Sequence, residues 1–454
     1  MSKRIHVTAL YITITLLIIC ICGCGSAQSE SVAETTVPAT DDISSETSPD
    51  KDNYAAGDVP QIYISTKDNV GSSLEKSDGY VDADVVIVDT DSTMLESTDS
   101  KIKVRGNSTA EGAKKPYNIK FSEKQEILGL GCAKTWCLLA NCFDPTLMRN
   151  FLVLDLASRM ELQYTPDQRI VEVYLDGTFL GCYNITEKVE AGSDRVAIDT
   201  ESGDFLIEYE AGKDEEGVTY ITTDHNLRFA VNEPEEPTKA QLSAITDVLD
   251  ALDSALMTYD YSEVLDIIDE ESFAKYYVLN EFVKSVDVDY SSVFFYYKDG
   301  VLYAGPVWDY DQSMGNAWEE QYPDYYNSED GLNSYEGKRA SWNLVYNYLL
   351  EFDEFKDAVK QQYSENHGLF ESLALEGGFI DTFVTEYASV IERNFDEAGW
   401  LVNGQYSYLM RIPDETYEEN VDFLKDWING RLKWMDEYLE YNNSDIAYNE
   451  KQKS

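Results

Sequence analysis

Histidine is scarce in this chain, with only three copies, at His6, His225 and His367. A Ser-His-Asp hydrolase needs a histidine base beside its nucleophile, so this scarcity argues against that class of enzyme. No Cys-x-x-Cys motif follows the N-terminal segment either. Because structural zinc sites are built from closely spaced cysteines and histidines, a zinc site is not expected.

Basic residues are heavily outnumbered. The 454 residues include 35 Lys and Arg against 85 Asp and Glu, which gives a net charge of -50. Such a surface repels nucleic acid and anionic lipid, so the sequence predicts no nucleic-acid partner. It would also repel a nucleotide polyphosphate unless metal ions and a local basic pocket intervene.

An apolar run stands at the N-terminus, from about Val7 to Ile21, behind Lys3 and Arg4. It is too short for a spanning helix of the mature protein and predicts a targeting segment. It closes with Ile21-Cys22-Gly23-Cys24, which resembles a bacterial lipoprotein cleavage box with Cys24 as the lipidated residue. An ordinary signal peptide is the alternative. Both interpretations predict export, and the first predicts a lipid anchor on the outer side of the bacterial cell membrane.

Large apolar residues are nearly absent from Ser26 to about Val59, so this stretch cannot bury enough surface to fold. At its full length the chain also exceeds one typical domain. The predicted organisation is a lipoprotein signal peptide (1–23), a disordered tether (24–59), a strand-rich N-lobe (60–234), a helical C-lobe with an acidic hairpin (235–441) and a tail (442–454).

Four cysteines remain after the predicted signal and anchor: Cys132, Cys137, Cys142 and Cys182. Two disulfides are possible in an exported protein. Free buried thiols are equally consistent with the sequence, because Cys137 and Cys182 lie inside apolar strand patterns. The disulfide state therefore stays open at this point.

Alternating or β-branched apolar segments predict strands through the first half of the chain. They are residues 61–66, 81–89, 101–105, 114–121, 135–141, 171–175, 178–186 and 204–209. Asp144-Pro145 resembles an N-cap followed by proline at the first helical position, which predicts a helix to about Met160. Apolar spacings of three and four then predict helices in the second half, and residues 316–341 read as a loop. The predicted helices are 238–258, 261–268, 271–285, 342–363, 379–395 and 417–441. The fold class expected from this order is α+β.

The acidic hairpin is the centre of the second half. Asp287 and Asp289 precede a strand at 293–297, the turn Lys298-Asp299-Gly300 follows, and a second strand runs from 301 to 308. Asp309 and Asp311 come directly after it. Because a hairpin brings its two ends together, we expect these four carboxylates on one side of a small sheet. The alternative is that they only cap a helix and occupy turns.

Four converging carboxylates would repel one another unless a cation sat among them. Oxygen-only clusters of this kind suit Mg²⁺, Mn²⁺ or Ca²⁺. A base-type Asp before a hairpin and a metal-binding Asp after it is also the layout of a phosphotransferase site.

Several short motifs follow one another along the chain. They are Val104-Arg105-Gly106-Asn107-Ser108-Thr109, Lys114-Lys115-Pro116-Tyr117-x-Ile119-Lys120-Phe121, Asp144-x-Thr146-Leu147-Met148-Arg149-Asn150, Pro306-Val307-Trp308-Asp309-Tyr310-Asp311, and Trp427-Ile-x-x-Arg431-x-x-Trp434. With them the chain resembles the spore coat protein H (CotH) kinase family, which is secreted or surface-attached. The resemblance implies an atypical protein-kinase-like two-lobe fold, with ATP and Mg²⁺ or Mn²⁺ as cofactors.

The resemblance also implies roles for individual residues. Asp287 is similar to the base that accepts the proton of the acceptor hydroxyl, and Asp309 to the metal-binding Asp. Asp311 and Asn316 are candidates for a second ion or its waters. The remaining implied site residues are Arg105, Asn107 and Ser108 in a phosphate-facing loop, Lys120 or Lys115 on a phosphate, and Glu187 and Glu208 orienting that lysine or lining the nucleotide cleft. The chain departs from ordinary kinases in lacking their G-x-G-x-x-G loop.

Two functions remain at this stage. One is a metal-dependent protein kinase that transfers phosphate from ATP to exported or surface proteins, which the retained Asp287 and Asp309 favour. The other is a non-catalytic surface module for adhesion or as a scaffold. The scarcity of external ATP favours the second, and the aromatic loop from Trp318 to Tyr335 would suit stacking on a sugar or a partner.

Overall fold

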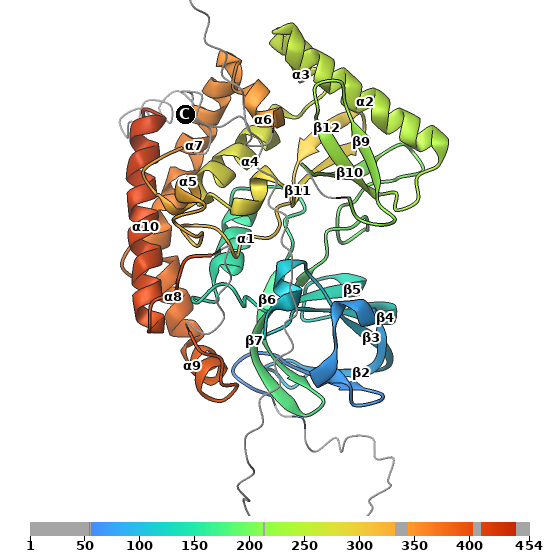
Figure 1. Ribbon diagram of the computed structural model, residues 1–454, viewed down its shortest axis with the longest axis vertical. Coiled ribbons are helices and arrows are strands. Elements are labelled where there is room, and N and C mark those ends of the chain that lie inside the picture. The colour runs from blue at the N-terminus through green and yellow to red at the C-terminus, as the bar shows by residue number, and fades with distance from the viewer. Residues whose placement is uncertain (1–53, 55, 212–213, 332–343, 403–409, 442–454) are drawn as a thin grey trace, which may run out of the picture. The chain divides into compact units, whose positions relative to one another are not determined.

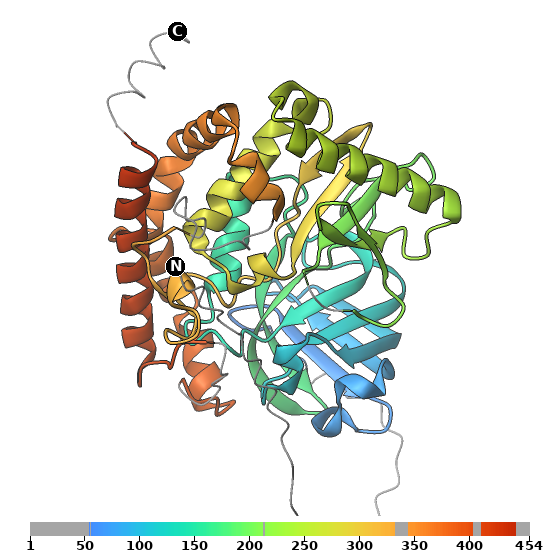
Figure 2. The same ribbon diagram turned by 45° about the horizontal axis from the view of Figure 1, so that its top comes forward.

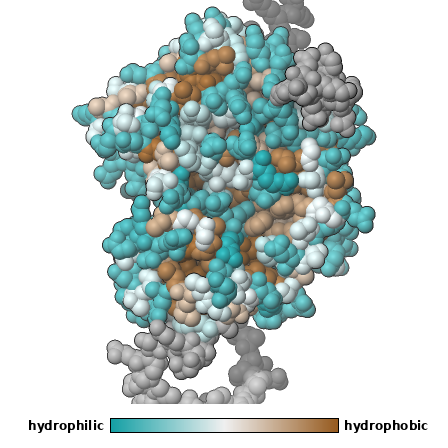
Figure 3. Space-filling model, turned by 180° about the vertical axis from the view of Figure 1, so that it is seen from behind, coloured by the Kyte–Doolittle hydropathy of each residue, from teal (hydrophilic) through white to brown (hydrophobic). Residues whose placement is uncertain are grey.

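The computed structural model describes residues 54, 56–211, 214–331, 344–402 and 410–441. From Tyr54 onward the chain forms one compact unit. The predicted signal peptide, Cys24, the tether up to residue 53 and the tail lie outside the described residues. Within the described part, no helix combines the length and apolarity that a membrane crossing needs. Figure 3 shows one face, over which hydrophilic residues predominate and apolar residues gather in smaller patches.

The first half of the chain closes into a β-barrel (Figure 1). Its strands are β1 (Gln61–Thr66), β2 (Val81–Val88), β3 (Met94–Val104), β4 (Tyr117–Glu126), β5 (Cys132–Leu139), β6 (Gln168–Leu175) and β7 (Thr178–Glu187). Their order is β1-β2-β3-β4-β5-β7-β6, and a parallel pairing of β1 with β6 closes the ring. The predicted strands 171–175 and 178–186 are confirmed in β6 and β7, which form a hairpin around Asp176-Gly177. Alternation decides which side chains fill the barrel: Ile102, Val104 and Ile119 are buried in its core.

A second sheet takes strands from both halves of the chain (Figure 2). They are β8 (Phe205–Tyr209), β9 (Thr219–Thr222), β10 (Arg228–Glu233), β11 (Val293–Lys298) and β12 (Val301–Ala304). The predicted acidic hairpin is confirmed as β11 and β12, although β12 ends at Ala304 instead of residue 308. Strands β9 and β10 were not predicted. Because β11 pairs with β8, the sheet crosses the expected lobe boundary at residues 234 and 235. The α+β class with strands first and helices later is confirmed, whereas the closed barrel and the shared sheet depart from the expected pair of kinase-like lobes.

Helices form the rest of the second half, joined by α1 from the first. Their bounds are α1 (Arg149–Arg159), α2 (Lys239–Thr258), α3 (Tyr261–Leu265), α4 (Glu270–Val283), α5 (Pro323–Tyr326), α6 (Leu344–Leu349), α7 (Asp353–Ala374), α8 (Phe379–Glu386), α9 (Ala388–Asp396) and α10 (Tyr417–Tyr438). Two predicted long helices are each divided, one before Phe352 and one at Tyr387. Helix α2 lies along the second sheet in both views, and α7 packs against α4 and α10. One apolar core joins these helices, α1 and the second sheet.

The start of α1 differs from the prediction. Asp144 is not an N-cap, because the helix begins at Arg149 behind Met148, which makes no side-chain cap. Leu147 has a φ of 60°, so residues 145–147 form a turn instead of a first helical turn. Asp144 accepts hydrogen bonds from the backbone N–H groups of Thr146 (3.0 Å) and Arg149 (2.7 Å). The Asp144 carboxylate is buried and forms an ion pair with Arg149 instead of capping the helix.

Lys114 joins the barrel to the helical half. Its ammonium group donates to the Cys182 carbonyl of β7 and to Asn394 Oδ1 of α9, the latter at 2.9 Å. The side chain is 1% exposed, and burial lowers the pKa of Lys114 to about 8. All four cysteines of the described part are free thiols, so the alternative of disulfides among Cys132, Cys137, Cys142 and Cys182 is not realised.

This buried lysine predicts a pH-dependent stability. In the unfolded chain Lys114 titrates near 10.5, so between pH 8 and 10.5 the unfolded state binds the extra proton. The free energy of unfolding is expected to rise with pH through this window, by roughly 3 kcal/mol at most from this group. Lys114→Met should remove that part of the slope. Urea unfolding of both proteins across the window checks this, and coincident slopes would contradict it.

Candidate functional site

A cavity of about 550 Å³ opens between the barrel, the second sheet and the segment after β12. We call Asp309–Asn316, which follows the hairpin, the acidic loop. The barrel side of the cavity is lined by Lys76, Arg105, Gly106, Asn107, Ser108, Thr109, Pro116, Leu139, Ala140, Asn141 and Cys142. The other walls are Asn150, Glu208, Glu210, Glu215, Val218, Tyr220, Ala230, Asn232, Asp287, Ser291, Ser292, Phe294, Trp308, Asp309, Asp311 and Gln312.

The second sheet supplies a row of cross-strand neighbours to this cavity. Ala230 of β10 lies opposite both Tyr220 of β9 and Glu208 of β8, and Glu208 lies opposite Phe294 of β11. Two aromatic rings thus flank one small residue and one carboxyl group on a single face. Burial raises the pKa of Glu208 to about 7, although its Oε1 accepts the N–H of Ser292 at 2.7 Å. The row suits a flat, partly polar ligand.

The acidic loop is held by side chains of two helices. Asn150 of α1 accepts the N–H of Tyr310 at 2.7 Å, and the Tyr310 hydroxyl donates to Asn280 of α4 at 3.1 Å. Asp309 has a φ of 67°, so the chain turns sharply there. Tyr310 is consequently anchored in the core while its two acidic neighbours line the cavity.

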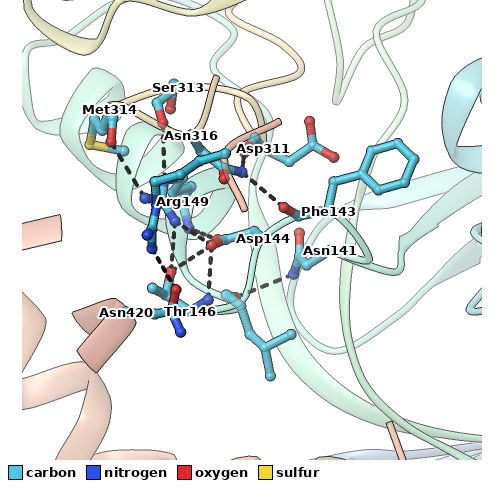
Figure 4. A network of polar contacts seen from close by, with 12 residues as sticks. Asn141, Phe143, Asp144, Thr146, Arg149, Asp311, Ser313, Met314, Asn316 and Asn420 are labelled. Atoms are coloured by element: carbon cyan, nitrogen blue, oxygen red, sulfur yellow. Dashed lines mark hydrogen bonds and ion pairs between the residues drawn. The ribbon is translucent and has the colours of Figure 1, made fainter. Parts of the chain in front are cut away.

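A buried ion pair supports the next part of the loop (Figure 4). The side chains of Arg149 and Asp144 are fully buried, and Arg149 Nη1 lies 2.5 Å from Asp144 Oδ1. Arg149 Nε also donates to the Ser313 carbonyl at 3.0 Å. Asn316 donates from Nδ2 to the carbonyls of Asp311 (2.7 Å) and Phe143 (2.9 Å). The loop conformation is therefore specified by groups that are far away in the sequence.

The carboxylates of the cavity repel one another. Burial raises the pKa of Asp311 well above its ordinary value, and the charges of Asp309 and Asp287 raise it further. Burial also raises the pKa of Asp309, and the Arg105 guanidinium opposes this rise. Both carboxyl groups would give up their protons more easily beside a cation.

The expected cage of carboxylates around an ion is not formed. Among the described residues, no group of three or more His, Cys, Asp and Glu side chains is arranged to hold a metal. The Asp289 side chain lies outside the described residues. Mg²⁺, however, is usually held by one or two carboxylates together with phosphate oxygens and waters. Asp309 and Asp311 fit that smaller donor set.

Asp287 reaches the cavity from a short 3₁₀ turn, Val286–Asp289. The Val286 N–H donates to the Gln312 carbonyl at 3.1 Å, which ties this turn to the acidic loop. The N–H groups of Tyr290 and Ser291 both donate to the Asp287 carbonyl. Asp287 is half-buried and lines the cavity together with Asp309 and Asp311, as the hairpin spacing predicted.

The loop after β3 also lines the cavity with the predicted Arg105, Asn107 and Ser108. Gly106 has a φ of 86°, and a Cβ there would lie 2.1 Å from the Thr109 hydroxyl, so only glycine fits this turn. Arg105 stacks on Trp308, with 5.2 Å between its Cζ and the ring centroid. This contact spans the cavity from the barrel to the residue before Asp309.

Other predicted site residues lie elsewhere. Lys115 donates to Glu75 Oε2 at 2.8 Å and to the Ala110 carbonyl, and it does not line the cavity. Lys120 is exposed on the outside of β4, away from the cavity lining. Glu187 forms a buried ion pair with Arg195. Burial raises the pKa of Glu187 to about 7. Asn316, the last residue of the acidic loop, is buried, bonds to the Asp311 and Phe143 carbonyls and does not line the cavity.

Sequence reasoning missed several lining residues. No sequence motif marks Asn141, Gln312 or the cavity-lining residues of β9 and β10. They reach the cavity only through contacts between segments that are distant in the chain. Asn150 could have been found, since it belongs to the Asp144–Asn150 motif.

Comparison with protein families matches residues 102–435 to the family described as CotH kinase protein. A comparison with curated proteins finds no match. Every residue that lines the cavity, except Lys76, falls within the matched range.

Proposed function

Because the chain belongs to the CotH kinase family, we propose that it transfers a phosphate group from ATP to a hydroxyl of an exported or cell-surface protein, with Mg²⁺ or Mn²⁺ as cofactor. The supporting observation is the crowding of Asp287, Asp309 and Asp311 around one cavity. Repelling carboxylates of this kind are what a divalent cation neutralises.

In this proposal each side chain has a distinct task. Asp309 and Asp311 would hold the cation, which would neutralise them and the phosphates of the nucleotide. Arg105 with the N–H groups and side chains of Asn107 and Ser108 would orient the phosphates. Asp287 comes from the turn before the hairpin and would accept the proton of the attacking hydroxyl.

The location of the protein is part of the proposal. The N-terminal segment supports export with a lipid anchor at Cys24, which would present the cavity to proteins outside the cytoplasm. A kinase placed there acts on exported or surface proteins, because these are the proteins it meets.

A test is transfer of labelled phosphate from ATP to coexpressed exported proteins, with Mg²⁺ or Mn²⁺. Asp287→Asn is expected to lower turnover by about 10²-fold, because a base contributes only to the chemical step. Metal-dependent nucleotide binding should stay near the wild-type value. If Asp287→Asn loses binding as well, Asp287 belongs to the metal-holding group. If the wild-type protein neither binds nor turns over the nucleotide, the kinase proposal fails.

A second candidate is a non-catalytic surface module. A groove of about 650 Å³ between residues 319–330 and α10 favours it, because aromatic rings and acids line that groove. Its walls include Tyr326, Phe423 and Trp427 with Glu319, Asp324, Asp330 and Asp426. Nucleotide-independent binding to a surface component by a protein without turnover would favour this candidate.

A further inference from the structure

The outer face of the barrel carries a group of cations beside the cavity. Ile102 and Val104 of β3 point into the barrel core, so the alternating residues Lys103 and Arg105 lie on its outside. On the neighbouring strand, Asn118 lies opposite Lys103, and Lys120 follows it on the same face. We call Lys103, Arg105 and Lys120 the cationic cluster.

One tyrosine ring brings the two lysines together. The Lys103 ammonium lies 4.7 Å from the centroid of the Tyr80 ring, and that of Lys120 lies 5.6 Å from the same centroid. Arg105, two residues after Lys103, is at the wall of the cavity. The cluster therefore continues from the cavity along the barrel.

The cluster is not neutralised by the acid-rich chain around it. Its neighbour Lys101 forms an ion pair with Asp82 at 3.5 Å, and Lys188 forms one with Glu190 at 3.0 Å. Among the residues that the structure describes, the members of the cluster form no ion pair. Burial lowers the pKa of the Lys103 ammonium, and the charges of Lys188 and Lys120 lower it further. Gathered cations of this kind are stabilised by an anion.

We infer that the cationic cluster binds phosphate oxyanions, with Lys103 as the main ligand. The inference rests on the proposed function as far as the phosphates of a nucleotide are concerned, since Arg105 lines the cavity. Free phosphate or pyrophosphate offers the same chemistry. Lys103 would then make the phosphate contact that the family resemblance implied for Lys120 or Lys115. Lys115 is already bound to Glu75, whereas Lys103 lies near the end of β3, two residues before Arg105.

The test is calorimetric titration of the full chain with pyrophosphate and, separately, with Mg²⁺-ATP. Lys103→Gln is expected to weaken pyrophosphate binding by about 10- to 100-fold, the range for a lost hydrogen bond to a charged group. Lys103→Arg should keep most of the affinity. Lys101→Gln is the matched control on the same strand and face, and it should have little effect. Thermal unfolding of each variant shows whether it is folded.

The outcomes separate the inference from the proposed function. Weakened binding of both ligands identifies the nucleotide phosphates as the anion, and weakened pyrophosphate binding alone identifies a free phosphate. Pyrophosphate binding that depends on Lys103, in a protein that does not bind Mg²⁺-ATP, supports the inference and refutes the kinase proposal. Unchanged affinity in Lys103→Gln, or an equal loss in Lys101→Gln, overturns the inference.

Discussion

Asp309→Asn is expected to abolish metal-dependent nucleotide binding and to lower phosphate transfer by at least about 10³-fold. Asp309 lies in the segment after β12, lines the cavity and is one of two carboxylates that fit a divalent cation. Asparagine keeps the shape and tolerates the φ of 67°, so the loss would come from the charge. Titration with Mg²⁺-ATP and a turnover assay measure the two effects.

The stability of this variant provides an internal control. Burial and mutual repulsion raise the pKa of Asp311 and disfavour its charge, so removing the Asp309 charge should relieve the folded state. Without a cation the variant should melt at or above the wild-type temperature, and added Mn²⁺ should stabilise only the wild type. Asp299→Asn, in the exposed turn of the same hairpin, is the matched control and should behave as wild type. Wild-type nucleotide affinity in Asp309→Asn would refute the assigned role.

Arg149→Met is expected to lower the free energy of unfolding by about 3–5 kcal/mol. The substitution leaves the fully buried Asp144 carboxylate without its cation. It also removes the donor to the Ser313 carbonyl, which holds the acidic loop. Chemical denaturation of the purified protein measures the loss.

A pair on the same helix separates this effect from a general loss of charge. Arg159 lies 3.3 Å from Asp155 on the surface of α1, and Arg159→Met should cost less than about 1 kcal/mol. Replacing Asp144 by Asn together with Arg149→Met should recover part of the stability, because no buried charge remains unpaired. A loss in Arg149→Met no larger than that in Arg159→Met would show that the buried pair does not stabilise the fold.

Most strands and the hairpins were predictable because their signals are local. The segment 61–66 alternates within itself, and Asp299-Gly300 supplies the backbone conformation that a tight turn needs. The hairpin geometry also explains why Asp287, Asp309 and Asp311 could be expected together. By contrast, β10 pairs with β8 and β9 pairs with β10, so neither strand forms without the second sheet.

One assignment was wrong, and one did not reach a contact between strands. Asp144 followed by proline resembles a helix cap, but the inward position of Arg149 draws the carboxylate into an ion pair. The alternation of 114–121 placed Lys120 on the outer face correctly. It did not reveal that Lys103, on the adjacent strand, lies over the same Tyr80 ring as Lys120. Because Tyr80, Lys103 and Lys120 belong to three separate segments, the spacing within one segment does not encode their contact.

By itself the sequence determined the α+β class, the family and the acidic hairpin, because each depends on residues that are neighbours in the chain. The tertiary structure decided which of the predicted residues share the cavity. Closure of the barrel through β1 and β6, and pairing of β8 with β11, join segments that are remote in sequence. Those pairings bring Arg105, Glu208 and Asp309 to one cavity and leave Lys115 and Glu187 in ion pairs outside it. Such pairings are selected by burial of whole apolar faces, a property of the folded chain that no single segment carries.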